Sequence, residues 1–127
     1  IVQCAADLPL TRLMALASIA DACISVDTGP AHIAAALGCP LVVLFGQTDA
    51  RQFRPLGVND VRVIANKNWR NFDGSAEQWA AQNSGSDISV EQVLVGYQQL
   101  QTRNSMTHAP VTIEWQKDTE LHFALAS

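Results

Sequence analysis

The turn from Asp27 to His32, with the sequence Asp-Thr-Gly-Pro-Ala-His, holds residue types that suit a phosphorylated sugar. The Asp27 carboxylate can accept hydrogen bonds from sugar hydroxyls, and Thr28 adds a hydroxyl group. Gly29 carries no side chain, so an anion can approach the backbone closely. His32 supplies an imidazole a few residues farther along. If a helix begins here, its free N–H groups and its dipole favour an anion such as phosphate.

The same turn also has a purely structural interpretation. Asp27 or Thr28 can serve as a helix N-cap, Pro30 can start the helix, and His32 can be a half-buried polar residue. Helix caps are far more common than ligand sites, so the turn taken alone favours this structural interpretation.

The flanking segments predict how the turn is positioned. Residues Ala22–Val26 and Leu41–Phe45 are continuous apolar runs of strand length. Between them, Pro30–Leu37 is rich in alanine and is followed by Gly38, which is the expected punctuation of a short helix. Continuous apolar strands indicate a parallel sheet covered on both faces. We therefore predict a strand–helix–strand unit with the turn at the carboxyl edge of the sheet, where α/β proteins bind ligands.

The stretch from Ile24 to Thr48 resembles the nucleotide-sugar-binding lobe of glycosyltransferase family 9, the heptosyltransferases. Three motifs occur in order: Asp-Thr-Gly-Pro-x-His, Ala-Ala-x-Leu-Gly-x-Pro and Phe-Gly-x-Thr. The resemblance covers residues 1–57 well and residues 61–101 loosely. We accordingly expect residues 1–104 to form part of a nucleotide-sugar-binding lobe and residues 105–127 to form a hairpin tail of unknown role.

The resemblance implies an α/β fold, with a partial Rossmann-like parallel sheet from the C-terminal half of a GT-B glycosyltransferase. It implies inverting sugar transfer from a nucleotide diphosphate donor, with ADP-heptose favoured and no metal or other cofactor required. The donor would contact Asp27, Thr28, Gly29 and His32. The lipopolysaccharide core acceptor would bind through a lobe that is missing from this chain. The implied location is cytoplasmic, with peripheral attachment at the inner membrane as a variant.

Composition excludes several other classes of function. The 127 residues are 48% hydrophobic and 16% charged, which is typical of a globular protein with one core. The net charge is −4 without a Lys/Arg cluster, which argues against a nucleic-acid partner. No apolar run reaches the length of a membrane span. The three cysteines and three histidines are too scattered to indicate a metal site or a disulfide framework.

The remaining N-terminal segments are assigned from periodicity. Residues Ile1–Ala5 read as a strand, followed by a helix that Asp7 or Leu8 caps. Apolar residues recur at helical spacing and predict one buried face on this helix. Its members are Leu10, Leu13, Met14, Ala17 and Ala20. Val61–Ile64 reads as a further strand at or near a sheet edge.

In the segment that follows Phe45, two arginines and three aromatic residues stand out, and each group has two possible roles. Arg51 or Arg54 can meet a phosphate, although a solvated surface arginine is the commoner case. Residues 66–87 show no sustained period and are expected to form a long loop. Its aromatic residues are expected to pin that loop to the core, and the alternative is stacking on a nucleotide base. They are Trp69, Phe72 and Trp79.

Two elements are expected at the C-terminal end. Residues 88–103 read as a helix that Ser89 caps alone, without the reciprocal contact of a capping box. Its apolar stripe is Val90, Val93, Leu94, Tyr97 and Leu100. Beyond it, apolar and polar residues alternate on both sides of Lys117–Glu120, which indicates a β-hairpin.

Three functions fit these observations. The chain can be the donor-binding part of a heptosyltransferase-like enzyme, a non-catalytic nucleotide-binding module, or a structural Rossmann-like module in which the turn is only a cap. We assign no catalytic residue within the chain, because the resemblance places the catalytic base in the other lobe. We therefore expect the chain alone to transfer no sugar.

Overall fold

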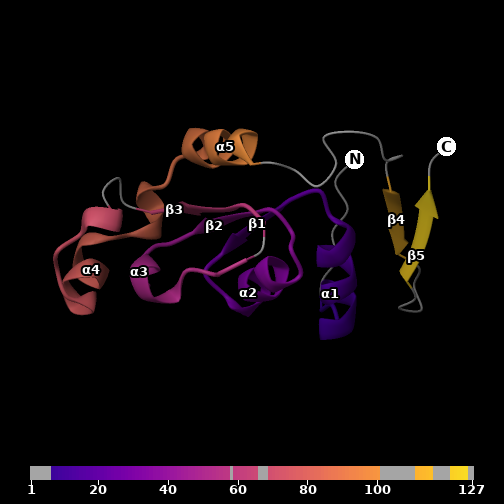
Figure 1. Cartoon of the computed structure of the whole chain (residues 1–127), viewed down its shortest axis with the longest axis horizontal. Coiled ribbons are helices and arrows are strands. Elements are labelled where there is room, and N and C mark those ends of the chain that lie inside the picture. The colour runs from indigo at the N-terminus through magenta and orange to yellow at the C-terminus, as the bar shows by residue number, and fades with distance from the viewer. Residues whose placement is uncertain (1–6, 58, 66–68, 101–110, 116–120, 126–127) are drawn as a thin grey trace.

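The computed structural model describes residues 7–57, 59–65, 69–100, 111–115 and 121–125. A three-stranded parallel sheet has the order β1-β2-β3 and consists of β1 (Cys23–Val26), β2 (Leu41–Leu44) and β3 (Val61–Ile64). The helices are α1 (Leu10–Ile19), α2 (Gly29–Ala36), α3 (Ala50–Phe53), α4 (Ala76–Gln82) and α5 (Val90–Gln99), with short 3₁₀ turns η1 (Trp69–Asn71) and η2 (Gly85–Asp87). A separate antiparallel sheet pairs β4 (Val111–Trp115) with β5 (Leu121–Leu125) (Figure 1).

The predicted strand–helix–strand unit is confirmed. β1 and β2 are parallel, and their register pairs Val26 with Leu44 at the carboxyl edge. α2 begins at Gly29, one residue before Pro30. Gly38 has a φ of 75°, a left-handed conformation that glycine adopts without a steric penalty, so the chain can turn from α2 into β2. The edge position predicted for β3 is confirmed for the described residues.

The sheet is covered by α2 on one face and α5 on the other (Figure 1). On the α2 face, Leu41 and Val43 of β2 are fully buried against Ala31 and Ala35. Burial of such an apolar side chain contributes about 1.5–3 kcal/mol. On the other face, α5 approaches closely through Gly96, where an added Cβ would lie 2.9 Å from Ile64 Cδ1. The helix backbone therefore lies directly over the Ile64 side chain at this point.

Coverage of both faces was expected for the first two strands and holds only for β2. On β1, Ile24 is 50% exposed and Val26 is 57% exposed. The expectation is wrong for β1 because α5 packs on β2 and β3. An apolar run of this length therefore does not distinguish a strand buried on both faces from one that is buried on a single face.

The expected apolar face of α1 is confirmed for Ala17, which is buried, and for Leu13 and Ala20, which are half-buried, and is wrong for its two other members. Pro9 is the N-cap, in place of the expected Asp7 or Leu8. Leu10 and Met14 are exposed, and the fully buried residue of the helix is Ala17. The reason is that α1 packs on α2 through small side chains.

α5 also presents a different face from the expected one, and it spans Val90–Gln99. Of the expected stripe, Val90, Leu94 and Tyr97 are exposed, whereas Leu100 is buried as expected. Gly96, which was not part of the stripe, is also buried. The helix instead places Gly96 against the sheet, where an added Cβ would meet the Ile64 side chain.

The expectation that Ser89 caps α5 alone is also wrong. The Ser89 hydroxyl accepts a hydrogen bond from Gln92 N–H at 3.2 Å, and Gln92 Oε1 accepts one from Ser89 N–H at 2.8 Å. These reciprocal bonds form a complete capping box.

Residues 69–87 are more ordered than the long loop that was expected. α4 has its own capping box between Ser75 and Gln78. Trp79 has an exposed fraction of 0% and belongs to the core, so the expectation that the aromatic residues anchor this segment is confirmed for Trp79.

The expected hairpin is present in β4 and β5, with Ile113 opposite Phe123. The expected strand Ile1–Ala5 and the boundary at residue 104 lie outside the described residues. Among the helices that are described, none is both long enough and apolar enough to cross a membrane.

Candidate functional site

The turn after β1 is placed at the carboxyl edge of the sheet by one backbone hydrogen bond. Asp27 N–H donates to the carbonyl of Leu44 at 3.1 Å, which extends the pairing of β1 and β2 by one residue. Thr28 is extended, with φ −149° and ψ 171°, and occupies the N-cap position of α2. Its carbonyl accepts from Ala31 N–H at 3.1 Å. The expected N-cap position is therefore confirmed for Thr28.

The side chain of Thr28 does not cap the helix. Thr28 Oγ1 lies 3.4 Å from the carbonyl of Val26, and no hydrogen bond runs from this side chain to the first turn of α2. Pro30 has no N–H, and Ala31 N–H is already bonded to Thr28. Within the described residues, the N–H groups of Thr28 and Gly29 donate to no other protein group. They are the donors that this helix start can offer to an anion.

The protein leaves free space around this helix start. A Cβ added at Gly29 would meet no atom within 4 Å, so packing within the described residues does not require a glycine there. Thr28, Gly29 and His32 are exposed, and Asp27 is half-buried. The half-buried position that the structural interpretation gave to His32 is therefore wrong. Close backbone approach by a ligand is a physical reason for a glycine at this position.

A pocket of about 260 Å³ lies at the same sheet edge, beyond the ends of β1 and β2. It is lined by Val26, Asp27, Leu44, Phe45, Gly46, Thr48, Gly85 and Ile88. Of the four predicted site residues, Asp27 lines this pocket, whereas Thr28, Gly29 and His32 lie on α2 and the turn before it. Asp27 thus stands between the open helix start and the pocket.

Several pocket residues were not predicted as site residues. Gly46 and Thr48 belong to the Phe-Gly-x-Thr motif, and that motif was the signal that could have identified them. Gly85 comes from the segment that showed no period, and Ile88 is the first residue of the expected helix over residues 88–103. The sequence alone gives no signal for these two, because their position depends on how α4 packs.

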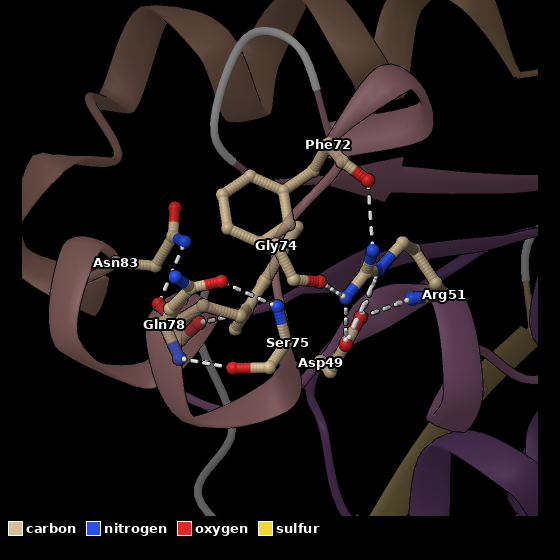
Figure 2. A network of polar contacts seen from close by, with 9 residues as sticks. Asp49, Arg51, Phe72, Gly74, Ser75, Gln78 and Asn83 are labelled. Carbon is tan, nitrogen blue, oxygen red and sulfur yellow. Dashed lines mark hydrogen bonds and ion pairs between the residues drawn. The ribbon is translucent and has the colours of Figure 1, made fainter.

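The turn after β2 leads into an ion pair between buried Asp49 and half-buried Arg51 (Figure 2). Asp49 is 3% exposed and caps α3 by accepting from Arg51 N–H at 2.9 Å. Arg51 Nη2 donates to Asp49 Oδ2 at 2.6 Å, and Nε donates to Oδ1 at 3.0 Å. Hydrogen bonds from the Arg51 side chain hold the pKa of the Asp49 carboxyl below its usual value, against the opposing effect of burial.

Arg51 also ties α3 to the segment before α4. Its Nη1 donates to the carbonyl of Phe72 at 2.7 Å, and its Nη2 donates to the carbonyl of Gly74 at 2.9 Å (Figure 2). The guanidinium lies 4.9 Å from the centre of the Phe72 ring. Arg51 is therefore a structural residue, and neither of the interpretations considered for it, phosphate ligand or solvated arginine, is correct. Arg54 is exposed, with its guanidinium 5.8 Å from the ring centre of Trp69.

The pocket wall after β2 is held by α4. Trp79 Nε1 donates to the carbonyl of Gly46 at 3.0 Å. A Cβ added at Gly46 would lie 2.9 Å from the nitrogen of Gly85, so the two backbones touch at this point. The ring of Trp79 meets Phe72 edge to face, with ring centres 5.2 Å apart.

The described residues contain no group of three or more His, Cys, Asp or Glu side chains arranged to hold a metal ion. The arrangement can bind an anion at two backbone N–H groups and polar hydroxyl groups at the Asp27 carboxylate beside them. Both halves of a phosphorylated sugar have matching partners at this edge.

Comparison with known proteins gives two matches. The sequence model of a family described as glycosyltransferase family 9 (heptosyltransferase) matches residues 1–80. A stretch of 54 residues, or 42% of the chain, is 46% identical to lipopolysaccharide heptosyltransferase 3 of Escherichia coli. That stretch corresponds to 16% of the E. coli protein, so the match spans well under a quarter of this relative. No solved structure shows significant similarity to the chain.

Proposed function

Because the chain belongs to glycosyltransferase family 9, the heptosyltransferase family, we propose that it forms the donor-binding part of such an enzyme. The observation that carries the proposal is the open start of α2. The N–H groups of Thr28 and Gly29 have no partner among the described residues and stand at the carboxyl edge of a parallel sheet, and an added Cβ at Gly29 would meet open space. This combination suits the diphosphate of a nucleotide sugar.

In this proposal, each residue of the turn contacts a different part of the ligand. The diphosphate lies over the N–H groups of Thr28 and Gly29, where the dipole of α2 favours its negative charge. The Asp27 carboxylate would repel phosphate and instead accepts hydrogen bonds from sugar hydroxyls. His32, exposed in the first turn of α2, orients the same ligand from the other side of Gly29.

The architecture, the donor, the acceptor and the location are proposed from the family to which the chain belongs. The sheet belongs to the C-terminal half of a GT-B architecture, with residues 1–104 forming part of the donor lobe and residues 105–127 a hairpin tail. The donor is ADP-heptose, the acceptor is the lipopolysaccharide core, and the enzyme works on the cytoplasmic side of the inner membrane. The described α/β core and the relatedness to a lipopolysaccharide heptosyltransferase support this assignment.

In the proposed reaction an acceptor hydroxyl attacks the anomeric carbon of the donor sugar, a base removes the hydroxyl proton, and the nucleoside diphosphate leaves. The N–H groups at the start of α2 stabilise the charge that develops on the departing diphosphate. The base must lie within hydrogen-bond reach of the acceptor hydroxyl. Asp27 is instead assigned to the donor sugar, so the base comes from another part of the enzyme and this chain alone transfers no sugar.

The binding proposal is tested by calorimetry with ADP, GDP and UDP on three proteins: the unchanged chain, Gly29→Val and Ala36→Val. The Cβ of a valine at Gly29 would meet no protein atom within 4 Å, and the side chain would occupy the anion's approach, so the affinity for the diphosphate should fall at least about tenfold. Ala36→Val places the same side chain at the exposed far end of α2 and should leave the affinity unchanged. Equal affinities for a folded Gly29→Val variant and the unchanged chain would show that the diphosphate binds elsewhere.

The transfer proposal needs a separate assay. The purified chain is incubated with ADP-heptose and a heptose-deficient lipopolysaccharide acceptor, and ADP release and acceptor mass are followed. We expect no acceptor-dependent release of ADP. Acceptor-dependent release together with a glycosylated product would mean that the chain contains a complete active site.

A further inference from the structure

We infer that Trp79 is a positioning residue for the sugar unit of the donor, because it fixes both backbone segments that wall the pocket beside Asp27. The inference rests on the proposed function, since it assigns the open start of α2 to the diphosphate and the adjacent pocket to the sugar. Trp79 itself is fully buried and cannot touch a ligand. It acts through Gly46 and Gly85.

The first wall of the pocket is the segment from Phe45 to Thr48, and the indole ring of Trp79 holds it in place. Trp79 Nε1 donates to the carbonyl of Gly46 at 3.0 Å, and Gly46 lines the pocket between the end of β2 and Thr48. A buried indole N–H and a carbonyl that satisfy each other are costly to separate, since each then lacks a partner. This bond therefore fixes the path of the chain from Phe45 to Thr48.

The second wall is held by the backbone of the same residue. The carbonyl of Trp79 accepts two hydrogen bonds from buried Asn83, one from its backbone N–H at 3.0 Å and one from Nδ2 at 2.8 Å. Asn83 lies two residues before Gly85, the second glycine of the pocket. Gly85 then packs directly on Gly46. A Cβ added at Gly46 would lie 2.9 Å from the backbone nitrogen of Gly85. One residue thus holds both walls in contact.

The pocket that both segments line suits a sugar. Asp27 and Thr48 supply a carboxylate and a hydroxyl group for ring hydroxyls, and Val26 and Ile88 supply apolar surface for the C–H face of the ring. Its volume of about 260 Å³ has room for one monosaccharide unit. Hydrogen bonds to several ring hydroxyls require the donors and acceptors to be held within about 0.5 Å. The position of the segment from Phe45 to Thr48 relative to Asp27 therefore controls the affinity for the sugar.

The inference predicts an effect on one part of the ligand only. Loss of the Trp79 N–H bond should loosen the wall at Gly46, which contacts the sugar, and leave the N–H groups of Thr28 and Gly29 in place. The affinity for a nucleotide sugar should fall while the affinity for the nucleoside diphosphate stays the same. A general loss of stability would lower both affinities together.

The experiment replaces Trp79 site-specifically with 3-benzothienylalanine, which has sulfur in place of the indole N–H and the same ring shape. The matched control carries 5-fluorotryptophan at Trp79, which retains the N–H donor. Calorimetry measures the affinity of each folded protein for ADP and for ADP-heptose. We expect the benzothienyl protein to bind ADP-heptose about five- to tenfold more weakly. ADP binding should stay within about twofold, and the fluorotryptophan protein should match the unchanged chain.

Three outcomes would overturn the inference. Unchanged binding of ADP-heptose by the benzothienyl protein would show that the wall does not depend on this bond. Equal losses for ADP and ADP-heptose would assign Trp79 a purely structural role. An unchanged chain that binds neither ligand would refute the proposed function and, with it, this inference.

The genetically encoded variant Trp79→Phe also lacks the N–H donor and should reproduce the selective loss.

Discussion

The turns after β1 and β2 leave the same edge of one sheet and differ sharply in their contacts. At the turn after β1, Thr28 and Gly29 are exposed, and a side chain added at Gly29 would meet no atom within 4 Å. At the turn after β2, Gly46 is bonded by Trp79 and packed against Gly85, and the ion pair of Asp49 with Arg51 follows at once. One turn is open, and the other is fixed by protein contacts at both of its ends.

This difference is what a ligand site at a sheet edge requires. A binding turn must keep hydrogen-bond donors free of protein partners, so that a ligand can replace the water around them. The neighbouring turn can supply rigidity, because the end of β1 and the end of β2 are joined through Asp27 N–H and the carbonyl of Leu44. The contacts that position the site are therefore concentrated beside the residues that would bind.

The largest effect is expected from Arg51→Ala, which removes the guanidinium from the fixed turn. Asp49 would then be a buried carboxylate without its partner, and the carbonyls of Phe72 and Gly74 would lose their donor. We expect the melting temperature to fall by roughly 10 °C in a thermal scan followed by circular dichroism. Arg51→Lys should recover little, since an ammonium cannot make the paired contacts of the guanidinium.

Arg54→Ala is the matched control for this change. Arg54 is exposed and three residues away, so its removal should change the stability by less than about 0.5 kcal/mol. Similar melting temperatures for Arg51→Ala and Arg54→Ala would contradict the view that the ion pair holds the turn.

An intermediate effect is expected when the two glycines are exchanged for alanine one at a time. At Gly46 the new Cβ would lie 2.9 Å from the nitrogen of Gly85, a backbone atom that must shift, at a cost of about 2 kcal/mol. At Gly29 the same methyl group meets open space, and the stability should change by less than about 0.5 kcal/mol. Urea unfolding of both variants measures the difference. Equal costs would remove the contrast between the two turns.

The open turn was predictable from the sequence, and the fixed turn was not. Asp27 to His32 lies between two apolar runs with Pro30 and Gly38 as punctuation, so the strand–helix–strand unit and the helix start followed from local signals. The fixed turn depends on Trp79, which is more than thirty residues away from Gly46 in the chain. A single sequence carries no sign of that contact.

Local signals were also present and unused in the less regular segment. Ser75 and Gln78 have the spacing of a capping box and begin α4, as Ser89 and Gln92 do for α5. The buried faces of α1 and α5 had a different cause. Small residues such as Ala17 and Gly96 face their neighbours there, so helix packing followed close approach and not the stripe of large apolar side chains.

A smaller effect is expected when acid weakens the fixed turn. Asp49 has a pKa below its ordinary value when folded, so its contribution to stability is complete above the ordinary carboxyl pKa of about 4. The contribution is lost as the pH falls through the lower pKa of the folded state. Thermal scans between pH 3 and pH 7 should show a steeper acid loss for the unchanged chain than for Asp49→Asn. Parallel curves would mean that this carboxylate is not the group that titrates.

The smallest effect is expected at Thr28, and it tests whether the open turn is free of structural duties. Replacing a capping Ser or Thr by Ala usually costs about 1 kcal/mol, because an N–H of the first turn loses its acceptor. Ser89→Ala should show that full cost, since the Ser89 hydroxyl accepts from Gln92 N–H at 3.2 Å. The hydroxyl of Thr28 accepts no such bond, so Thr28→Ala should cost less than about 0.5 kcal/mol in urea unfolding. If both variants lost about 1 kcal/mol, Thr28 would be a structural cap, and the turn after β1 would be less open to a ligand than its exposure indicates.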